Sequence, residues 1–255
     1  NQVYFGFWTD HYSDENWQMS TFVIDAEKKD IISRIFYSED KGESMAIEVV
    51  PYDGKLWLLG APMSKKTLVF NPETGKTENV IEYEECNQQR INVLPSIDKA
   101  LVMHGYHYEE GCSVSVIDLN TKKYEGIVYI DDLFTELHDI EGKIYGCGND
   151  YLYDETKEGF GTYELKGKKL EFTPILISAM QADEGRIGNR GSSSLVLPDG
   201  TIVIRDRTYG ITIRNPDGSL QHIYAQGYES EHYSLGNIYY SEKLERIYVY
   251  AGLDH

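Results

Sequence analysis

The sequence has little cysteine, and the few cysteines are not spaced as metal ligands. Cys86, Cys112 and Cys147 are the only three in 255 residues, and no two of them form a Cys-x-x-Cys pair. This excludes a zinc ribbon, a thioredoxin-like motif and a disulfide-rich scaffold. Cys86 and Cys112 are candidates for one disulfide if the protein is exported, whereas Cys147 is typical of a small core residue.

Long apolar runs and basic residues are also scarce. No stretch approaches the roughly 18 apolar residues of a membrane span. The chain opens on the strand-like NQVYFGFW, so we expect any export signal or lipid anchor to have been removed. Lys and Arg number 24 against 42 Asp and Glu, a net charge of -18. This charge disfavours nucleic acid and anionic lipid as partners, and it is compatible with a cation, a neutral polar ligand or simply a soluble acidic surface.

Familiar catalytic and modification signatures are missing as well. The sequence has no Gly-x-Ser-x-Gly, no His-Glu-x-x-His and no glycine-rich phosphate loop placed between a strand and a helix. It also has no Asn-x-Ser/Thr acceptor for N-glycosylation, which favours a bacterial source if the protein is exported.

Strand-like segments dominate what is present, and they recur. Short runs rich in Val, Ile, Tyr and Phe alternate with turns of Gly, Asp, Asn and Lys. Six of these runs begin with a polar residue and end in a small or polar one: 2–10, 55–62, 99–106, 143–150, 201–208 and 246–254. Their starts differ by 53, 44, 44, 58 and 45 residues, and tight turns such as PYDGK and LPDGT precede most of them.

This recurrence predicts an all-β protein built from four-stranded antiparallel repeats, the pattern of a β-propeller. We expect one domain over residues 1–255 with blades at about 1–41, 42–85, 86–132, 133–178, 186–228 and 229–255, the last one partial. Six blades are favoured over five. The first repeat lacks its first strand and the last lacks two, so a missing segment or a partner chain is expected to complete the ring. The alternative fold is a β-sandwich with accidental repeats.

One repeat resembles a known blade type. In SLVLPDGTIVIRDRTYGITIRNPDGS (194–219), the Pro198-Asp199-Gly200 turn, Asp206 and the Pro216-Asp217-Gly218 turn resemble the NHL repeat. The second to fourth repeats are similar more loosely to YVTN-type propellers. The resemblance implies the propeller fold but no activity, because such folds host binding modules, lyases and lactonases alike.

The loops predict where a ligand binds. In such a blade, the first and third connections lie on one face and are short here, whereas the others are long and rich in ring side chains. Tyrosine and tryptophan suit sugar or peptide recognition because they combine an apolar face with one hydrogen-bonding group. The candidate ligand-binding residues on these loops are Trp8, Tyr12, His104, Tyr106, His107, Tyr151, Arg205, Arg207 and Tyr209. Several of the aromatic rings are alternatively plugs packed between blades.

Two arrangements of residues are candidate metal sites. Asp10, Asp150, Asp206 and Asp254 fall at similar places in four repeats, and four carboxylates around a channel mouth suit calcium. His104 and His107 could hold zinc or manganese with His11 and Asp10, but a turn at Gly105 is needed to bring both rings to one side. Hydrogen bonding of these histidines to carboxylates is the simpler alternative.

The sequence therefore predicts a secreted or cell-surface binding or scaffold module that recognises a carbohydrate or a peptide, although a cytoplasmic location is also compatible. The competing hypothesis is a metal-assisted enzyme, a lyase or a lactonase-like hydrolase, that uses His104, His107, Asp150 or Asp206. We favour the binding module. No cofactor is implied beyond a divalent cation, calcium rather than zinc or manganese. We expect no nucleic-acid partner and no membrane insertion.

Overall fold

The computed structural model describes residues 2–7, 20–25, 27–36, 48–60, 65–85, 88–107, 111–130, 133–149, 159–176, 191–197, 199–206, 210–223, 233–241 and 243–253. Within these residues, every regular element is a β-strand except for one short 3-10 turn, η1 (Pro95–Ile97). The chain divides into two compact units, Asn1–Tyr129 and Ile130–His255, and each is described by itself. No helix in the described part of the chain is long and apolar enough to cross a membrane.

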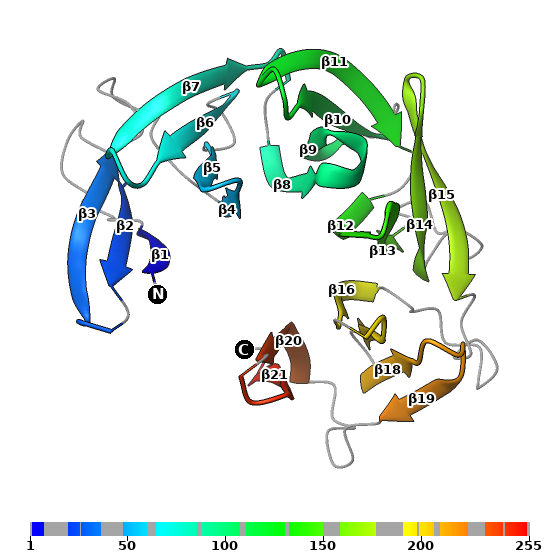
Figure 1. Ribbon diagram of the computed structural model, residues 1–255. Helices are drawn as coiled ribbons and strands as arrows, with labels where there is room; N and C mark the ends of the chain where they lie inside the picture. Colours follow the sequence, from blue (N-terminus) through cyan, green and yellow to red (C-terminus); the bar gives the residue numbers. More distant parts are fainter. Residues whose placement is uncertain are drawn as a thin grey trace. The chain divides into compact units, whose positions relative to one another are not determined.

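Unit 1 contains three antiparallel groups of strands, which Figure 1 shows from blue to green. The first is β1 (Gln2–Phe7), β2 (Ser20–Asp25) and β3 (Asp30–Phe36). The second is β4 (Glu48–Tyr52), β5 (Lys55–Leu59), β6 (Lys66–Asn71) and β7 (Lys76–Glu82). The third is β8 (Gln88–Leu94), β9 (Lys99–His107), β10 (Gly111–Asp118) and β11 (Lys123–Ile130). Strands pair with their neighbours in the sequence.

The second sheet is buried on both faces, and its sequence explains why. The central strand β5 reads KLWLL, an apolar run without the alternation of a half-exposed strand. Its odd and even residues enter two different clusters. Leu56 and Leu58 pack with Leu68 and Phe70 on one face. Trp57 and Leu59 point to the other face.

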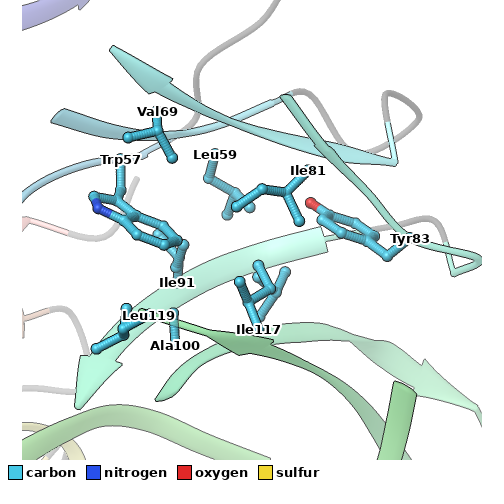
Figure 2. Packing of buried hydrophobic residues seen from close by; sticks show 10 residues of the cluster. Trp57, Leu59, Val69, Ile81, Tyr83, Ile91, Ala100, Ile117 and Leu119 are labelled. Atoms are coloured by element: carbon cyan, nitrogen blue, oxygen red, sulfur yellow. The ribbon is translucent and has the colours of Figure 1, made fainter. Parts of the chain in front are cut away.

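That other face packs against the third sheet. Trp57, Leu59, Val69 and Ile81 come from the β4–β7 sheet, and they meet residues of β8, β9 and β10 that include Ile91 (Figure 2). Trp57 is only 1% exposed. Burial of a large apolar side chain contributes about 1.5–3 kcal/mol, so this interface is a principal source of stability in unit 1.

Unit 2 also contains three antiparallel groups, shown from green to red in Figure 1. The first is β12 (Leu133–Ile140), β13 (Lys143–Asn149), β14 (Gly159–Lys166) and β15 (Lys169–Leu176). The second is β16 (Gly191–Val196), β17 (Ile202–Asp206), β18 (Gly210–Arg214) and β19 (Leu220–Ile223). The third is the pair β20 (Tyr233–Ser241) and β21 (Arg246–Leu253). Tyr145 of β13 packs against Ile202 and Ile204, which joins the first two sheets.

The all-β class and the antiparallel four-stranded sheets predicted from the sequence are confirmed in the described residues. The recurring segments begin as strands at or next to the expected residues, for example Lys55, Lys99 and Lys143. Cys112, one of the two cysteines expected to pair if the protein is exported, is fully buried in strand β10, and the disulfide stays a prediction. Its expected partner Cys86 lies outside the described residues. The single-domain interpretation of residues 1–255 stays a prediction.

Candidate functional site: the loop end of the sheets

Because consecutive strands in each sheet are antiparallel, the connections alternate between its two ends. One end, which we call the turn end, has tight turns such as 53–54, 95–98, 119–122, 141–142 and 167–168. The other, the loop end, has the longer connections, among them 8–19, 37–47, 150–158, 177–190 and 224–232. Long connections on a rigid scaffold are where binding residues concentrate.

The first two strands of several sheets share an irregularity at the loop end. The register shifts between Gln88 and Arg90 in the β8–β9 pair and between Phe134 and Leu137 in the β12–β13 pair. The β16–β17 and β20–β21 pairs shift in the same place, at 191–193 and 235–238. In all four pairs the first strand carries the extra residue. Bulges of this kind redirect side chains next to binding sites, so the loop ends share a built-in deviation from the regular pleat.

Buried and half-buried polar side chains gather where the two packed sheets of unit 1 meet. His104 of β9 is fully buried, and its Nε2 lies 2.8 Å from Oγ of Ser115 on β10, a hydrogen bond whose donor depends on the tautomer. The ring of Tyr83, which follows β7, meets the imidazole edge to face at 5.5 Å. Tyr83 in turn lies 6.4 Å from the ring of Tyr124 on β11. We call these four residues the His104 cluster.

Burial affects the ionisation of the two tyrosines in the His104 cluster. Burial raises the pKa of the Tyr83 hydroxyl, and it also raises the pKa of Tyr124, to which the nearby Glu84 carboxylate adds. Both tyrosines are therefore neutral hydrogen-bonding groups at physiological pH.

A second set of contacts ties the first strand of one sheet to the first strand of the next within each unit. In unit 1 the Glu48 carboxylate of β4 accepts a hydrogen bond from the backbone N–H of Ile91 on β8 at 2.6 Å, and it lies 3.8 Å from the Arg90 guanidinium. In unit 2, Nε2 of His138 on β12 lies 2.8 Å from the Ser194 carbonyl oxygen on β16. Since a carbonyl can only accept, Nε2 of His138 carries the proton.

The predicted ligand-binding residues fall into three groups: one that is buried, some at the loop end, and others outside the described residues. His104 is in the buried cluster, which differs from the exposed rim expected of a ligand-binding residue. Tyr106 and His107 continue strand β9, and Arg205 lies in β17, so their backbones are at the loop end. Beyond the described residues lie Trp8, Tyr12, Tyr151, Arg207 and Tyr209.

The described residues give no arrangement of side chains that supports either candidate metal site. Asp206 ends strand β17, whereas Asp10, Asp150 and Asp254 lie outside the described part of the chain. Within that part, no group of three or more His, Cys, Asp or Glu side chains is arranged to hold a metal ion. The turn at Gly105 that a shared His104–His107 site needs is not formed, since β9 runs through it as a bulged strand.

Sequence reasoning missed three residues whose side chains make these contacts within the two units. Ser115 and Ser194 occupy strand positions that look like polar surface residues, and Tyr83 follows β7 in the acidic segment EYEEC. One signal could have predicted the burial of His104: it directly follows the apolar run 100–103. A polar residue that continues a strand buried on both faces is expected to be buried as well, with a hydrogen-bond partner.

Comparisons with known proteins give a fold and no family. No family model matches the chain, and no curated protein sequence matches it. Solved structures do match: hydrazine synthase from Kuenenia stuttgartiensis, with a TM-score of 0.60, 12% identity and coverage of 91% of this chain and 69% of that chain. A functionally unknown protein from Desulfotomaculum acetoxidans matches with a TM-score of 0.59, 13% identity and coverage of 96% and 72%.

The extracellular domain of a two-component system from B. thetaiotaomicron is also similar, with a TM-score of 0.57, 13% identity and coverage of 92% of this chain. The present chain spans only 30% of the length of that protein. The similar structures are all-β with antiparallel sheets, as this chain is. At such low identity the likeness concerns the fold alone.

Proposed function

We propose that this chain is a β-propeller, six-bladed and built from NHL- or YVTN-like repeats, that recognises a carbohydrate or a peptide at its loop end without catalysing a reaction. The observation that carries the proposal is the alternation of connections: tight turns lie at one end of the sheets, and the longest connections, 8–19, 37–47, 150–158, 177–190 and 224–232, lie at the other. The face-to-face packing of the β4–β7 and β8–β11 sheets supports the propeller, because blades bury their faces in this way.

The side chains available at the loop end support the ligand class. The connections 8–19 and 150–158 alone contain Trp8, Tyr12, Trp17, Tyr151 and Tyr153. Aromatic side chains with a polar tip contribute large contact areas at a low cost in conformational entropy, which suits neutral polar ligands such as sugars and peptides. The net charge of -18 argues against a polyanionic ligand.

A secreted or cell-surface location belongs to the same proposal. The support is indirect: one of the similar structures is the extracellular domain of a two-component system. A partner chain or a further segment that completes the ring is likewise proposed, because the first and last strand groups have three and two strands in the described residues.

The experiment is a screen of the purified protein on glycan and peptide arrays, followed by calorimetry with the strongest ligand. The test variant is Trp8→Ala/Tyr12→Ala, which removes two rings from the connection 8–19. The matched control is Tyr248→Ala, which removes a ring that is 45% exposed close to the turn 242–245 at the turn end. We expect affinity to fall at least about tenfold in the test variant, since anchoring aromatic residues each contribute about 1.4 kcal/mol or more.

The control variant is expected to bind as the parent does, and both variants should keep the melting temperature of the parent. Equal losses of affinity in the two variants would contradict binding at the loop end. A protein that binds no glycan and no peptide, or that turns over a sugar lactone or a polysaccharide, would overturn the proposal in favour of a scaffold or an enzyme.

A further inference from the structure

Three Asp-Gly pairs occur in the sequence, all at turn ends: Asp53-Gly54, Asp199-Gly200 and Asp217-Gly218. An aspartate followed by glycine can modify its own backbone. The glycine amide nitrogen attacks Cγ of the protonated aspartate carboxyl, a nitrogen–carbon bond forms, and the carboxyl hydroxyl leaves as water together with the amide proton. Water then opens the resulting succinimide at either carbonyl. One opening restores aspartate, and the other gives isoaspartate, in which the main chain runs through Cγ.

Two of the three pairs hold both reacting groups in hydrogen bonds. The Asp199 carboxylate accepts from the backbone N–H of Thr201 at 2.9 Å, and the Gly200 N–H donates to the Leu197 carbonyl at 2.9 Å. The attacking nitrogen and the attacked carboxyl therefore each have another partner. These bonds also hold the pKa of Asp199 below its usual range, which keeps the carboxyl ionised and unreactive toward the amide.

Asp217 repeats this arrangement. Its Oδ1 accepts from both the backbone N–H and the hydroxyl of Ser219, at 2.8 and 2.6 Å. The Gly218 N–H donates to the Asn215 carbonyl at 2.9 Å. The hydrogen bonds from Ser219, with a smaller contribution from the Arg214 charge, keep the pKa of Asp217 low.

Asp53-Gly54 lacks both restraints. The pair forms a two-residue hairpin turn between Tyr52 and Lys55, with φ of 48° and 67°. Both residues are exposed, and within the described residues neither the Asp53 carboxyl nor the Gly54 N–H has a hydrogen-bond partner. The adjacent cation, Lys55, is engaged elsewhere, because its Nζ donates to Glu78 at 2.9 Å.

From this contrast we propose that Asp53 is a modification site, the position at which this protein converts aspartate to isoaspartate. The modified turn carries an additional main-chain carbon between β4 and β5, two strands of the sheet that contains Trp57. The site lies at the turn end, so it is independent of ligand binding at the loop end.

The chain offers its own control. Glu141-Gly142 forms the same two-residue turn between Ile140 and Lys143, with φ of 50° and 82°. A glutamate in this position is therefore compatible with the fold, and its longer side chain would have to close a larger, less favourable imide ring. The matched variant is Asp53→Glu, which keeps the charge and copies the second turn.

The experiment follows isoaspartate during prolonged incubation in mildly acidic buffer below the melting transition. Peptide mapping by mass spectrometry with electron-transfer fragmentation, together with labelling by an isoaspartyl methyltransferase, locates the modified residue. We expect Asp53 to react on the order of tenfold faster than Asp199 and Asp217, because at the latter two sites hydrogen bonds must open first. In denaturant the three sites should react at similar rates.

Each outcome has a defined meaning. No isoaspartate at position 53 in the folded protein, or faster reaction at 199 or 217, would overturn the proposal. A preference for Asp53 that persists unchanged in denaturant would also overturn it, because the cause would then be local sequence and not the fold. Asp53→Glu is expected to abolish labelling at position 53 and leave the slow reaction at the other two sites unchanged.

Discussion

At the scale of single residues, His104 was a candidate ligand-binding residue in the sequence, and the structure shows it as a buried residue of the core. Its imidazole is fully buried, shares a hydrogen bond with Ser115 and packs on Tyr83. We predict that His104→Ala lowers the free energy of unfolding by about 2–4 kcal/mol, because it leaves a cavity and removes one hydrogen-bond partner of the buried Ser115 hydroxyl. Urea unfolding measures this change.

The control for His104 is Tyr129→Ala, since Tyr129 is 43% exposed on β11 and its removal should cost less than about 1 kcal/mol. A His104→Ala protein as stable as the parent would contradict the buried role and return His104 to the list of ligand-binding candidates. Ser115→Ala should lower stability in the same direction by a smaller amount, since it removes one partner of the hydrogen bond.

At the scale of elements, one lysine joins three strands of the β8–β11 sheet. Lys99 at the start of β9 donates to Asp118 at the end of β10 at 2.8 Å and to Glu125 on β11 at 3.0 Å. Lys55, Asn71 and Glu78 occupy the matching positions in the β4–β7 sheet, where Glu78 is the shared partner and accepts from both Lys55 and Asn71. A polar cross-link between three strands thus recurs at the turn end of two repeats, with a different central residue in each.

The Asp118 carboxylate makes this cross-link dependent on pH. The hydrogen bond from Lys99 and those from Thr121 hold the pKa of Asp118 below its usual range. A group whose pKa is lowered by folding stabilises the native state above its unfolded pKa of about 3.9, and this contribution is lost as the pH falls through the folded value. We predict that Asp118→Asn is less stable than the parent at neutral pH and that the difference shrinks in acid.

Urea midpoints measured from neutral to strongly acidic pH test this prediction. Asp98→Asn is the matched control, since Asp98 is exposed in the preceding turn with φ of 54°, a conformation that asparagine also tolerates. A difference between the Asp118→Asn variant and the parent that stays constant with pH would contradict the role assigned to the Asp118 carboxylate.

The elements also show what the sequence can predict. Turns such as Asp53-Gly54 and runs such as KLWLL are local signals, so the strands, their antiparallel pairing and their repetition follow from composition and period. The bulges at 88–90, 134–137, 191–193 and 235–238 have no residue signature, because they depend on how a strand meets its partner. The burial of His104 escaped prediction for the same reason: it requires Tyr83 from a different sheet.

At the scale of the whole molecule, charge is the dominant feature. A net charge of -18 produces self-repulsion in the folded state, which salt screens over a Debye length of about 10 Å at 0.1 M. Sodium chloride is therefore expected to raise the melting temperature. A calcium site built from Asp10, Asp150, Asp206 and Asp254 predicts a larger rise in melting temperature with calcium. The reason is that carboxylates that repel one another in the free protein become ligands when the ion is bound.

We predict that calcium chloride raises the melting temperature further than sodium chloride at the same ionic strength, and that EDTA reverses the additional rise. Ligand linkage sets the size of the effect: at a hundredfold excess over the dissociation constant, a single site adds about 2.7 kcal/mol. The Asp150→Asn/Asp254→Asn variant should lose the calcium increment and keep the sodium response, since it removes two of the proposed ligands and only a small part of the total charge. Equal effects of the two salts on the parent would contradict a shared metal site, and the four aspartates would then contribute only to the acidity of the surface.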